Sequence, residues 1–499
     1  MALRSRTERD GSFAGNRVER AIIDIGSNTV RLVIYGGSSR APVTVFNEKV
    51  VARLGREIAQ TGQLADEAVD LALRGLRRFA LLLEELEIET IDVVATAAVR
   101  EADNGGKFLA AIRQFGLAPR LLSGEGEART SAMGAIGAFP NIEGVVADLG
   151  GGSLELVSVA DQAPGAMSSL PLGTLRLPDF RGNNAHDQRR LIEDEINKAK
   201  WLDTAVPSLT LVGGTWRAMA AVAMEKRGYP LTDPHGFTLS RIEAQELAEG
   251  LSAASASELT NYSRLSQMRA GYLADAGALL GVLLDRIGPQ NVVFSSWGLR
   301  EGVLFDELDA AAKAQDPLLA GVGEFANLRG TPPILATRVA AWTVGALPPG
   351  SHGSERVRLA STMLALASMQ IEPNLRTDIA MDWALHKRWI DVDDCGRAMM
   401  AAAVSANKRE CNMPAMLRDL ASEDQIEQAI CWGLAIRLCR RLGGRSTRVF
   451  NASSLSIDAG KLVLAIDSDL VGLFGQPSEK DLQLLSQRLG LEAVCTIRN

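Results

Sequence analysis

Apolar runs and helical patterns alternate through the first half of the chain. Apolar runs at residues 21–25 and 30–35 lie on either side of a polar kink, Gly26-Ser27-Asn28, which predicts a β-hairpin. The pattern then predicts further strands and helices in turn. They are a strand over 43–54, a helix over 65–87, a strand running into a loop over 91–100, a helix over 105–115, a strand over 119–124 and a helix over 127–139.

The same theme returns after residue 140. The pattern predicts a hairpin over 145–159, a helix over 187–201, a strand, glycine turn and helix over 210–223, a helix over 269–287 and a strand, turn and helix over 291–308. Two successive sets of alternating strands and helices predict the α/β class, with two domains that face each other.

The pattern changes near residue 315. Residues 317–333 resemble a linker, 335–442 show helical spacing almost throughout, and the end of the chain predicts a small α+β domain with strands at 449–457, 461–466 and 491–497 and a helix at 480–489. The predicted organisation is a disordered tail (1–19), two α/β domains (20–135 and 136–315), an all-α domain (316–445) and a C-terminal α+β domain (446–499).

Composition excludes some classes of protein. The net charge of −7 argues against a nucleic-acid partner, and no apolar run is long enough to predict a membrane span. The five cysteines form no C-x-x-C pair, and the charged start lacks the apolar core of a signal peptide. These features predict buried, reduced thiols and a cytoplasmic protein.

One small motif occurs twice. DIGSNTVRLV begins at Asp24 and DLGGGSLELV begins at Asp148, with Asp, Gly, Leu and Val at matching places. A hairpin turn of glycine and small polar residues exposes backbone N–H groups that bind anionic oxygens. Two such turns on facing domains predict a clamp on one phosphate chain, formed by Ser27, Asn28 and Thr29 on one side and by Gly150, Gly151, Gly152 and Ser153 on the other.

The chain resembles the exopolyphosphatase and guanosine pentaphosphate phosphohydrolase family. The resemblance rests on the two copies of the motif together with ARLG (52–55), ATAAVREADN (95–104), SGEGEAR (123–129), LPLGTLRL (170–177), VGGT (212–215) and GLREG (298–302). It implies two actin-like (ribonuclease H-like) domains, as in the sugar kinases and Hsp70. For the later parts it implies an HD-like helical domain, a small C-terminal domain and a homodimer. Residues 335–442 contain no His-Asp dipeptide, so we expect the helical domain to lack metal ligands.

Candidate roles follow for four residues. Asp148, at a strand end beside the glycines, is the predicted metal ligand, and Glu155 would share the ion, although it could instead be a solvated strand carboxylate. Oxygen ligands favour Mg²⁺. Glu127, one or two residues into a helix, is the predicted general base, and it retains the second Glu of the family pattern S-G-x-E-E-A while Gly126 replaces the first. Arg100, at a strand-to-loop junction, would hold phosphate oxygens.

Other positions and activities stay open. Leu154 replaces the family's usual Thr, and Gly213, Gly214 and Thr215 match a nucleoside-binding segment that would equally well pack a helix on a strand. The leading hypothesis is a Mg²⁺-dependent exopolyphosphatase that binds inorganic polyphosphate and releases orthophosphate. Hydrolysis of pppGpp is the first alternative, since its site chemistry is the same. An ATP-binding kinase or ATPase and a non-catalytic regulator are the others.

Overall fold

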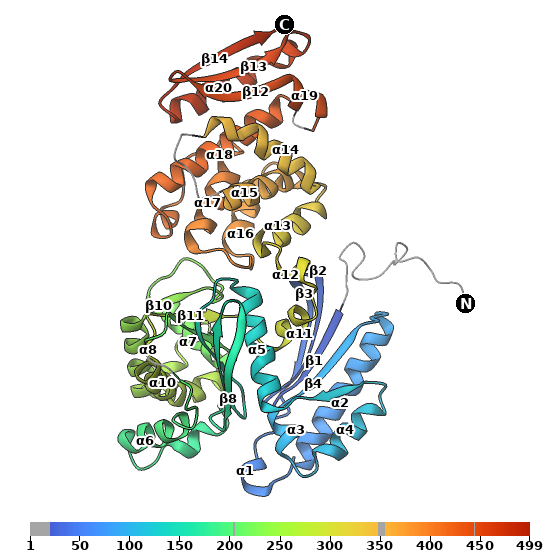
Figure 1. Cartoon of the computed structure of the whole chain (residues 1–499), viewed down its shortest axis with the longest axis vertical. Helices are drawn as coiled ribbons and strands as arrows, with labels where there is room; N and C mark the ends of the chain where they lie inside the picture. Colours follow the sequence, from blue (N-terminus) through green and yellow to red (C-terminus); the bar gives the residue numbers. More distant parts are fainter. Residues whose placement is uncertain (1–19, 203–204, 348–354, 444) are drawn as a thin grey trace, which may run out of the picture. The chain divides into compact units, whose positions relative to one another are not determined.

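A computed structural model describes residues 20–202, 205–347, 355–443 and 445–499 (Figure 1). The predicted tail, residues 1–19, lies outside them. The chain divides into two compact units, one ending at Ala314 and the other beginning at Gln315. None of the described helices combines the length and apolar character needed to cross a bilayer.

The first unit contains a five-stranded sheet in the order β3-β2-β1-β4-β5. Its strands are β1 (Arg20–Ile25), β2 (Val30–Ser38), β3 (Ala41–Val50), β4 (Ile91–Ala95) and β5 (Pro119–Leu121). Strands β1, β2 and β3 form an antiparallel meander, and β4 and β5 continue in parallel from β1. The first predicted hairpin is confirmed, with its turn at residues 26–29.

The second sheet of this unit repeats that order as β8-β7-β6-β9-β11 and adds an edge strand, β10. Its strands are β6 (Gly144–Leu149), β7 (Leu154–Ala160), β8 (Ala163–Leu170), β9 (Ser208–Val212), β10 (Thr238–Ser240) and β11 (Asn291–Ser295). Again the first three strands are antiparallel and the next two run parallel to β6. The second predicted hairpin is confirmed, and each motif copy occupies the same place in its sheet.

Helices cover both sheets and fill the space between them (Figure 1). α2 (Asp66–Glu85) and α4 (Gly105–Arg113) pack on the first sheet, while α7 (Gly214–Lys226), α8 (Arg241–Ala253) and α10 (Gln267–Ile287) pack on the second. Between the sheets lie α5 (Gly124–Ala138) and α11 (Leu299–Asp306), which share apolar cores with both. The two α/β halves therefore meet across this helix pair. The remaining helical segments of the unit are α1 (Ile58–Thr61), α3 (Ala97–Glu101), α6 (Ala185–Ile196), α9 (Ala256–Leu259), α12 (Ala310–Lys313) and the 3-10 helix η1 (Leu177–Phe180).

The second unit is mainly helical and ends in a small sheet. Its larger helices are α13 (Pro317–Asn327), α14 (Pro333–Thr343), α15 (Glu355–Ala367), α16 (Arg376–Leu385), α17 (Asp394–Ala406) and α18 (Glu423–Arg441). After α19 (Thr447–Ala452), the strands β12 (Ser453–Asp458), β13 (Lys461–Asp467) and β14 (Glu492–Arg498) form a sheet with α20 (Gln476–Arg488). Short 3-10 turns η2 (Val344–Ala346), η3 (Ser368–Gln370), η4 (Ala415–Asp419) and η5 (Ser468–Leu473) complete the unit.

The predicted linker at 317–333 is wrong. Residues 317–327 form α13, which begins with Asp316 accepting a hydrogen bond from the backbone of Leu319 and with Pro317 in the first turn. Its glycines resemble a linker, but Leu318 and Val322 are fully buried. Tertiary burial therefore outweighs the low helix propensity of this segment.

Four further expectations need correction. The segment over 91–100 is predicted as a strand running into a loop; the strand ends at Ala95, and residues 97–101 form the helix α3 instead of a loop. The strand predicted over 43–54 ends at Val50, and the strand predicted over 449–457 begins only at Ser453, after α19. All five cysteines are unpaired thiols, but only Cys431 and Cys439 are buried. Short Ala- and Val-rich segments fit a buried helix and a buried strand equally well, which explains the errors around α3 and α19.

Candidate active site

The first motif turn is held by the loop that follows β3. Within the turn, the N–H of Gly26 donates to the carbonyl of Thr29 over 3.0 Å. The backbone N–H groups of Arg53 and Gly55 then donate to the carbonyls of Asn28 and Ser27 over 3.0 and 2.8 Å. The ARLG segment thus fixes the turn by satisfying its carbonyls, which leaves the N–H groups of the turn to face a ligand.

The second turn has an equivalent support. The N–H of Gly150 donates to the carbonyl of Ser153, and the N–H groups of Thr174 and Leu175 donate to the carbonyls of Gly150 and Gly151 over 3.0 and 2.9 Å. Gly173 makes this contact possible, because a Cβ atom there would lie 2.2 Å from the carbonyl carbon of Gly152. The LPLGTLRL segment therefore supports the second turn as ARLG supports the first.

The two turns face each other. A Cβ atom on Gly152 would lie 2.7 Å from Ser27 Oγ and 3.1 Å from the Ala97 Cβ atom, so the turns approach to van der Waals distance. Both line a cavity of about 220 Å³. Nine of the predicted site residues line it: Ser27, Asn28, Thr29, Glu127, Asp148, Gly150, Gly151, Gly152 and Ser153. Arg100 and Glu155 do not line this cavity.

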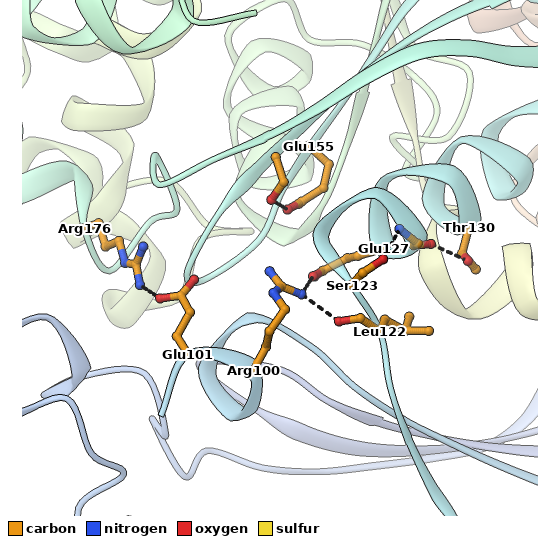
Figure 2. A network of polar contacts seen from close by, with 10 residues as sticks. Arg100, Glu101, Leu122, Ser123, Glu127, Thr130, Glu155 and Arg176 are labelled. Carbon is orange, nitrogen blue, oxygen red and sulfur yellow. Dashed lines mark hydrogen bonds and ion pairs between the residues drawn. The ribbon is translucent and has the colours of Figure 1, made fainter. Parts of the chain in front are cut away.

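Glu127 projects from the N-terminal turn of α5 (Figure 2). Ser123 caps this helix, since its Oγ accepts a hydrogen bond from the N–H of Gly126 over 3.0 Å. Glu127 is the fourth residue of the helix rather than the first or second, because α5 begins at Gly124. The cap therefore fixes the start of the helix so that this carboxylate points to the cavity.

Arg100 contacts Glu127 in this structure. Its Nη1 donates to Glu127 Oε2 over 3.0 Å and to the carbonyl of Leu122 over 2.9 Å, as Figure 2 shows. Arg100 belongs to α3, not to the predicted strand-to-loop junction. The next residue, Glu101, forms an ion pair with Arg176, which ties α3 to the segment that supports the second turn. Arg100 is thus placed to orient Glu127.

The pKa of the Glu127 carboxyl is raised toward neutral pH. Burial raises the pKa of Glu127 to about 7; the adjacent Arg100 works against this rise, and the negative charges of Asp148 and Asp24 add to it. A carboxylate that titrates near neutral pH is suited to accept a proton from water.

Asp148 and Glu155 lie directly opposite each other on β6 and β7. Asp148 Oδ2 accepts a short hydrogen bond from Ser131 Oγ, and Glu155 Oε1 accepts one from Ser169 Oγ over 2.9 Å. Burial raises the pKa of Asp148 to about 6. Burial also raises the pKa of Glu155 well above its usual value, and the charges of Glu127 and Asp148 reinforce the effect. Ionising both members of this pair is costly without a nearby cation.

This pair fits a magnesium site of the kind that retains water ligands. Mg²⁺ commonly binds one or two carboxylates and completes its coordination with water and phosphate oxygens. No group of three or more His, Cys, Asp or Glu side chains suited to a metal occurs within the described residues. Substrate and water would then supply ligands in addition to the two carboxylates.

The cavity also contains cations that the sequence did not single out. Its lining includes Arg31, Lys49, Arg217, Arg269 and Arg300. Burial lowers the pKa of Arg31 and of Arg269, which indicates that both guanidinium groups are partly removed from water. Arg31 and Arg300 lie within the motifs VRLV and GLREG and could have been found there, whereas Arg269 lies in α10, outside every motif that we identified. Such side chains suit a polyanionic ligand.

The glycine pair of VGGT also lines the cavity. Gly213, Gly214 and Thr215 line it, at the start of α7. They also join strand β9 to this helix, which is the packing role that the sequence left open. Their position beside the cavity does not by itself specify a nucleoside.

A sequence model of the Ppx/GppA phosphatase family matches residues 33–311, more than half of the chain. The chain belongs to this family. The match lies within the first unit. The Ppx/GppA segment thus includes α3, α5, the second motif copy and the GLREG segment, while the first turn lies just before it.

Curated proteins and solved structures agree with this assignment. Exopolyphosphatase 1 of Mycobacterium leprae is 27% identical over 310 residues, which cover 58% of this chain and 90% of that protein. Exopolyphosphatase 2 of Mycobacterium tuberculosis is 30% identical over 250 residues, covering 46% of this chain and 77% of that protein. The crystal structure of an Aquifex aeolicus Ppx/GppA family member matches with a TM-score of 0.51 and 26% identity, covering 60% of this chain and 99% of its own.

Proposed function

We propose that this protein is a metal-dependent exopolyphosphatase, a phosphoanhydride hydrolase that removes the terminal phosphate of inorganic polyphosphate as orthophosphate. The observation that supports the proposal is that the two glycine-containing turns, a carboxylate whose pKa is raised to about 7 and several cations line one cavity. The names of the relatives support the same substrate.

Each group of residues in the cavity would have a separate role. Backbone N–H groups and side chains of the two turns would hold the terminal phosphates, and the cationic lining would hold the phosphates that follow. Arg100 would keep Glu127 oriented. Glu127 would accept a proton from a water molecule while the oxygen of that water attacks the terminal phosphorus. The bond from this phosphorus to the bridging oxygen breaks, and the bridging oxygen leaves with the shortened chain.

Asp148 and Glu155 would hold Mg²⁺. When bound, Mg²⁺ neutralises negative charge on the phosphate oxygens. The two carboxylates lie on the strands that flank the second turn, so the ion site and the turn would act on the same phosphates.

Phosphate release from long-chain polyphosphate tests this proposal. We expect release in Mg²⁺ buffer, little release with a chelator, and loss of release in Glu127→Gln. The same assay with pppGpp and with ATP at equal concentration compares the alternatives. A larger kcat/KM for pppGpp or for ATP than for polyphosphate would overturn the proposed substrate.

We also propose that residues 316–445 form an HD-like scaffold that binds no metal, and that the protein is a cytoplasmic homodimer. The all-α character of α13 to α18 supports the scaffold. Metal analysis of the purified protein and sedimentation velocity would test the scaffold and the dimer separately.

A further inference from the structure

Four arginines of the second unit lie close enough to interact, and two of them pair with one carboxylate. Arg437, Arg440 and Arg441 come from the last turns of α18, and Arg376 is the first residue of α16. The carboxylate belongs to Asp481 of α20. We call Arg376, Arg437, Arg440 and Arg441 the four-arginine cluster. Figure 1 shows the three helices within the second unit.

Asp481 forms ion pairs with two members of the four-arginine cluster. Its Oδ1 lies 3.0 Å from Arg437 Nε and its Oδ2 lies 2.5 Å from Arg441 Nε. The Asp481 side chain is only 2% exposed and that of Arg437 is 11% exposed. This part of the cluster is therefore removed from water, and an unbalanced charge is costly in such a buried environment.

The other two members have no such partner. Arg376 donates to the carbonyls of Ile371 and Met369, which are neutral groups. The Nε of Arg440 is buried without a hydrogen-bond partner among the described residues, and within them neither Arg376 nor Arg440 forms an ion pair. Burial, together with the charges of Arg437, Arg376 and Arg441, lowers the pKa of Arg440 to about 10.

Among the described residues, Asp481 is the one carboxylate that pairs with members of this cluster, so four positive charges are offset by one negative charge and an excess of three remains. Guanidinium groups that are partly buried and close together repel one another unless an anion lies between them. Phosphate oxygens match the guanidinium fork, and a multiply charged phosphate offsets the excess better than a single carboxylate does.

We propose that the four-arginine cluster binds a phosphate-type anion, with the unpartnered Arg440 as a direct ligand. The anion is either orthophosphate or part of a condensed phosphate chain, and both present the same oxygens. The site lies wholly within the second unit and does not depend on the hydrolytic chemistry assigned to the first.

Hydrogen–deuterium exchange of the full chain tests the proposal directly. Orthophosphate and tripolyphosphate are compared with sodium chloride of equal ionic strength. We expect slower exchange in residues 369–376 and 437–443 with at least one phosphate. A response to orthophosphate identifies the free ion as sufficient, and a response to tripolyphosphate alone identifies a chain. No change at these residues with either compound overturns the proposal.

The same exchange data distinguish phosphate binding at the proposed active site from binding at the four-arginine cluster. Protection at residues 26–29 and 150–153 reports on the proposed active site, and protection near Arg440 reports on the cluster. Protection only at the turns would reject the cluster as a phosphate site and leave the proposed function intact. Protection only at the cluster would support the cluster as a phosphate site and would reject phosphate binding at the two turns.

Thermal unfolding of Arg440→Gln separates ligand binding from a purely structural role. Removing an unpaired, partly buried charge should leave the melting temperature in phosphate-free buffer equal to that of the parent or higher, while most of the rise caused by tripolyphosphate is lost. Arg418→Gln is the control, since this exposed side chain pairs with Glu423 on the surface. A variant that melts lower but keeps the full rise would contradict direct binding. Should the variant fail to fold, exchange of the parent chain alone decides the question.

Discussion

The Arg100 guanidinium donates to Glu127 Oε2 over 3.0 Å, joining a residue of α3 to one of α5. The contact bridges the elements that follow β4 and β5, and it holds the carboxylate that faces the cavity. Arg100 was expected to bind phosphate, and the geometry adds a second role, the orientation of the proposed base Glu127. The two roles are compatible, because a guanidinium has five N–H donors.

Replacing Glu127 with Gln should lower kcat by about a hundred- to ten-thousand-fold, because a neutral amide cannot accept the proton of water. Substrate binding should persist, since the turns are unchanged. Single-turnover phosphate release and equilibrium binding of tripolyphosphate measure the two effects. Arg100→Lys keeps the charge but loses the planar fork, so a smaller loss of kcat is expected. A Glu127→Gln enzyme with unchanged kcat would show that another group is the base.

Activity should rise with pH to a plateau. The base must be ionised, and burial raises the pKa of Glu127 to about 7 in the metal-free protein. A bound cation would offset the negative charge of Asp148 and lower this value, so the ascending limb of kcat/KM should lie at or below about pH 7. A pH profile from 5 to 9 at saturating Mg²⁺ checks this. A limb well above pH 8 would exclude Glu127 as the titrating group.

Metal binding should matter more for stability at high pH. Because folding raises the pKa values of Glu127, Asp148 and Glu155, the native state binds more protons than the unfolded state between their ordinary and raised values. These groups therefore reduce the free energy of unfolding as pH rises through that interval. Bound Mg²⁺ should reverse the loss, giving a larger rise in melting temperature at pH 8 than at pH 5.5.

Variants of the carboxylate pair provide the control for that measurement. Asp148→Asn and Glu155→Gln each remove one negative charge from a buried pair, so each should raise the melting temperature in metal-free buffer or leave it unchanged. Each should also reduce the gain from Mg²⁺. An undiminished gain in both variants would place the ion elsewhere.

The repeated motif was enough to predict that two hairpin turns face each other at one cavity. Each copy lies at the turn of a hairpin whose strands are buried along most of their length, so the apolar runs on either side of the polar residues fix the position of the turn. The two copies also differ in charge, and this difference is visible in the sequence. Asp24 lies opposite Arg31 in the first hairpin, whereas Asp148 lies opposite Glu155 in the second. The second pair thus consists of two carboxylates with no arginine between them, which agrees with its predicted role at a metal.

Features that depend on tertiary contacts could not be predicted. Arg269 reaches the cavity from α10, more than a hundred residues from either motif, and its own neighbourhood in the sequence gives no signal. The glycine-containing segment 317–327 is helical because its apolar side chains are buried by other helices of the second unit. In both cases the deciding partner is distant in the chain.

Gly173→Ala should damage activity without touching a predicted catalytic residue. The added Cβ atom would lie 2.2 Å from the carbonyl carbon of Gly152 and 2.3 Å from the N atom of Ser153, so the second turn must move. A kcat/KM reduced by at least tenfold is expected, because small displacements of positioning groups are costly. Gly271→Ala, in open space on α10, is the control and should add about 0.5–1 kcal/mol of stability. Equal activity of the two variants would show that the support of the second turn is dispensable.

Lys387 should acylate with an unusual pH dependence. Burial and the charges of Arg329, Arg388 and Arg397 lower the pKa of its ammonium group to about 8, and its Nζ lies 4.6 Å from the ring centroid of Trp389. Its rate of reaction with a limiting activated ester should therefore level off above about pH 9. Peptide mass spectrometry of the peptide that contains Lys387 measures this rate. Arg329→Gln removes one neighbouring positive charge and should move the Lys387 curve to higher pH, whereas a rate in the parent chain that keeps rising above about pH 9 would rule out the lowered pKa.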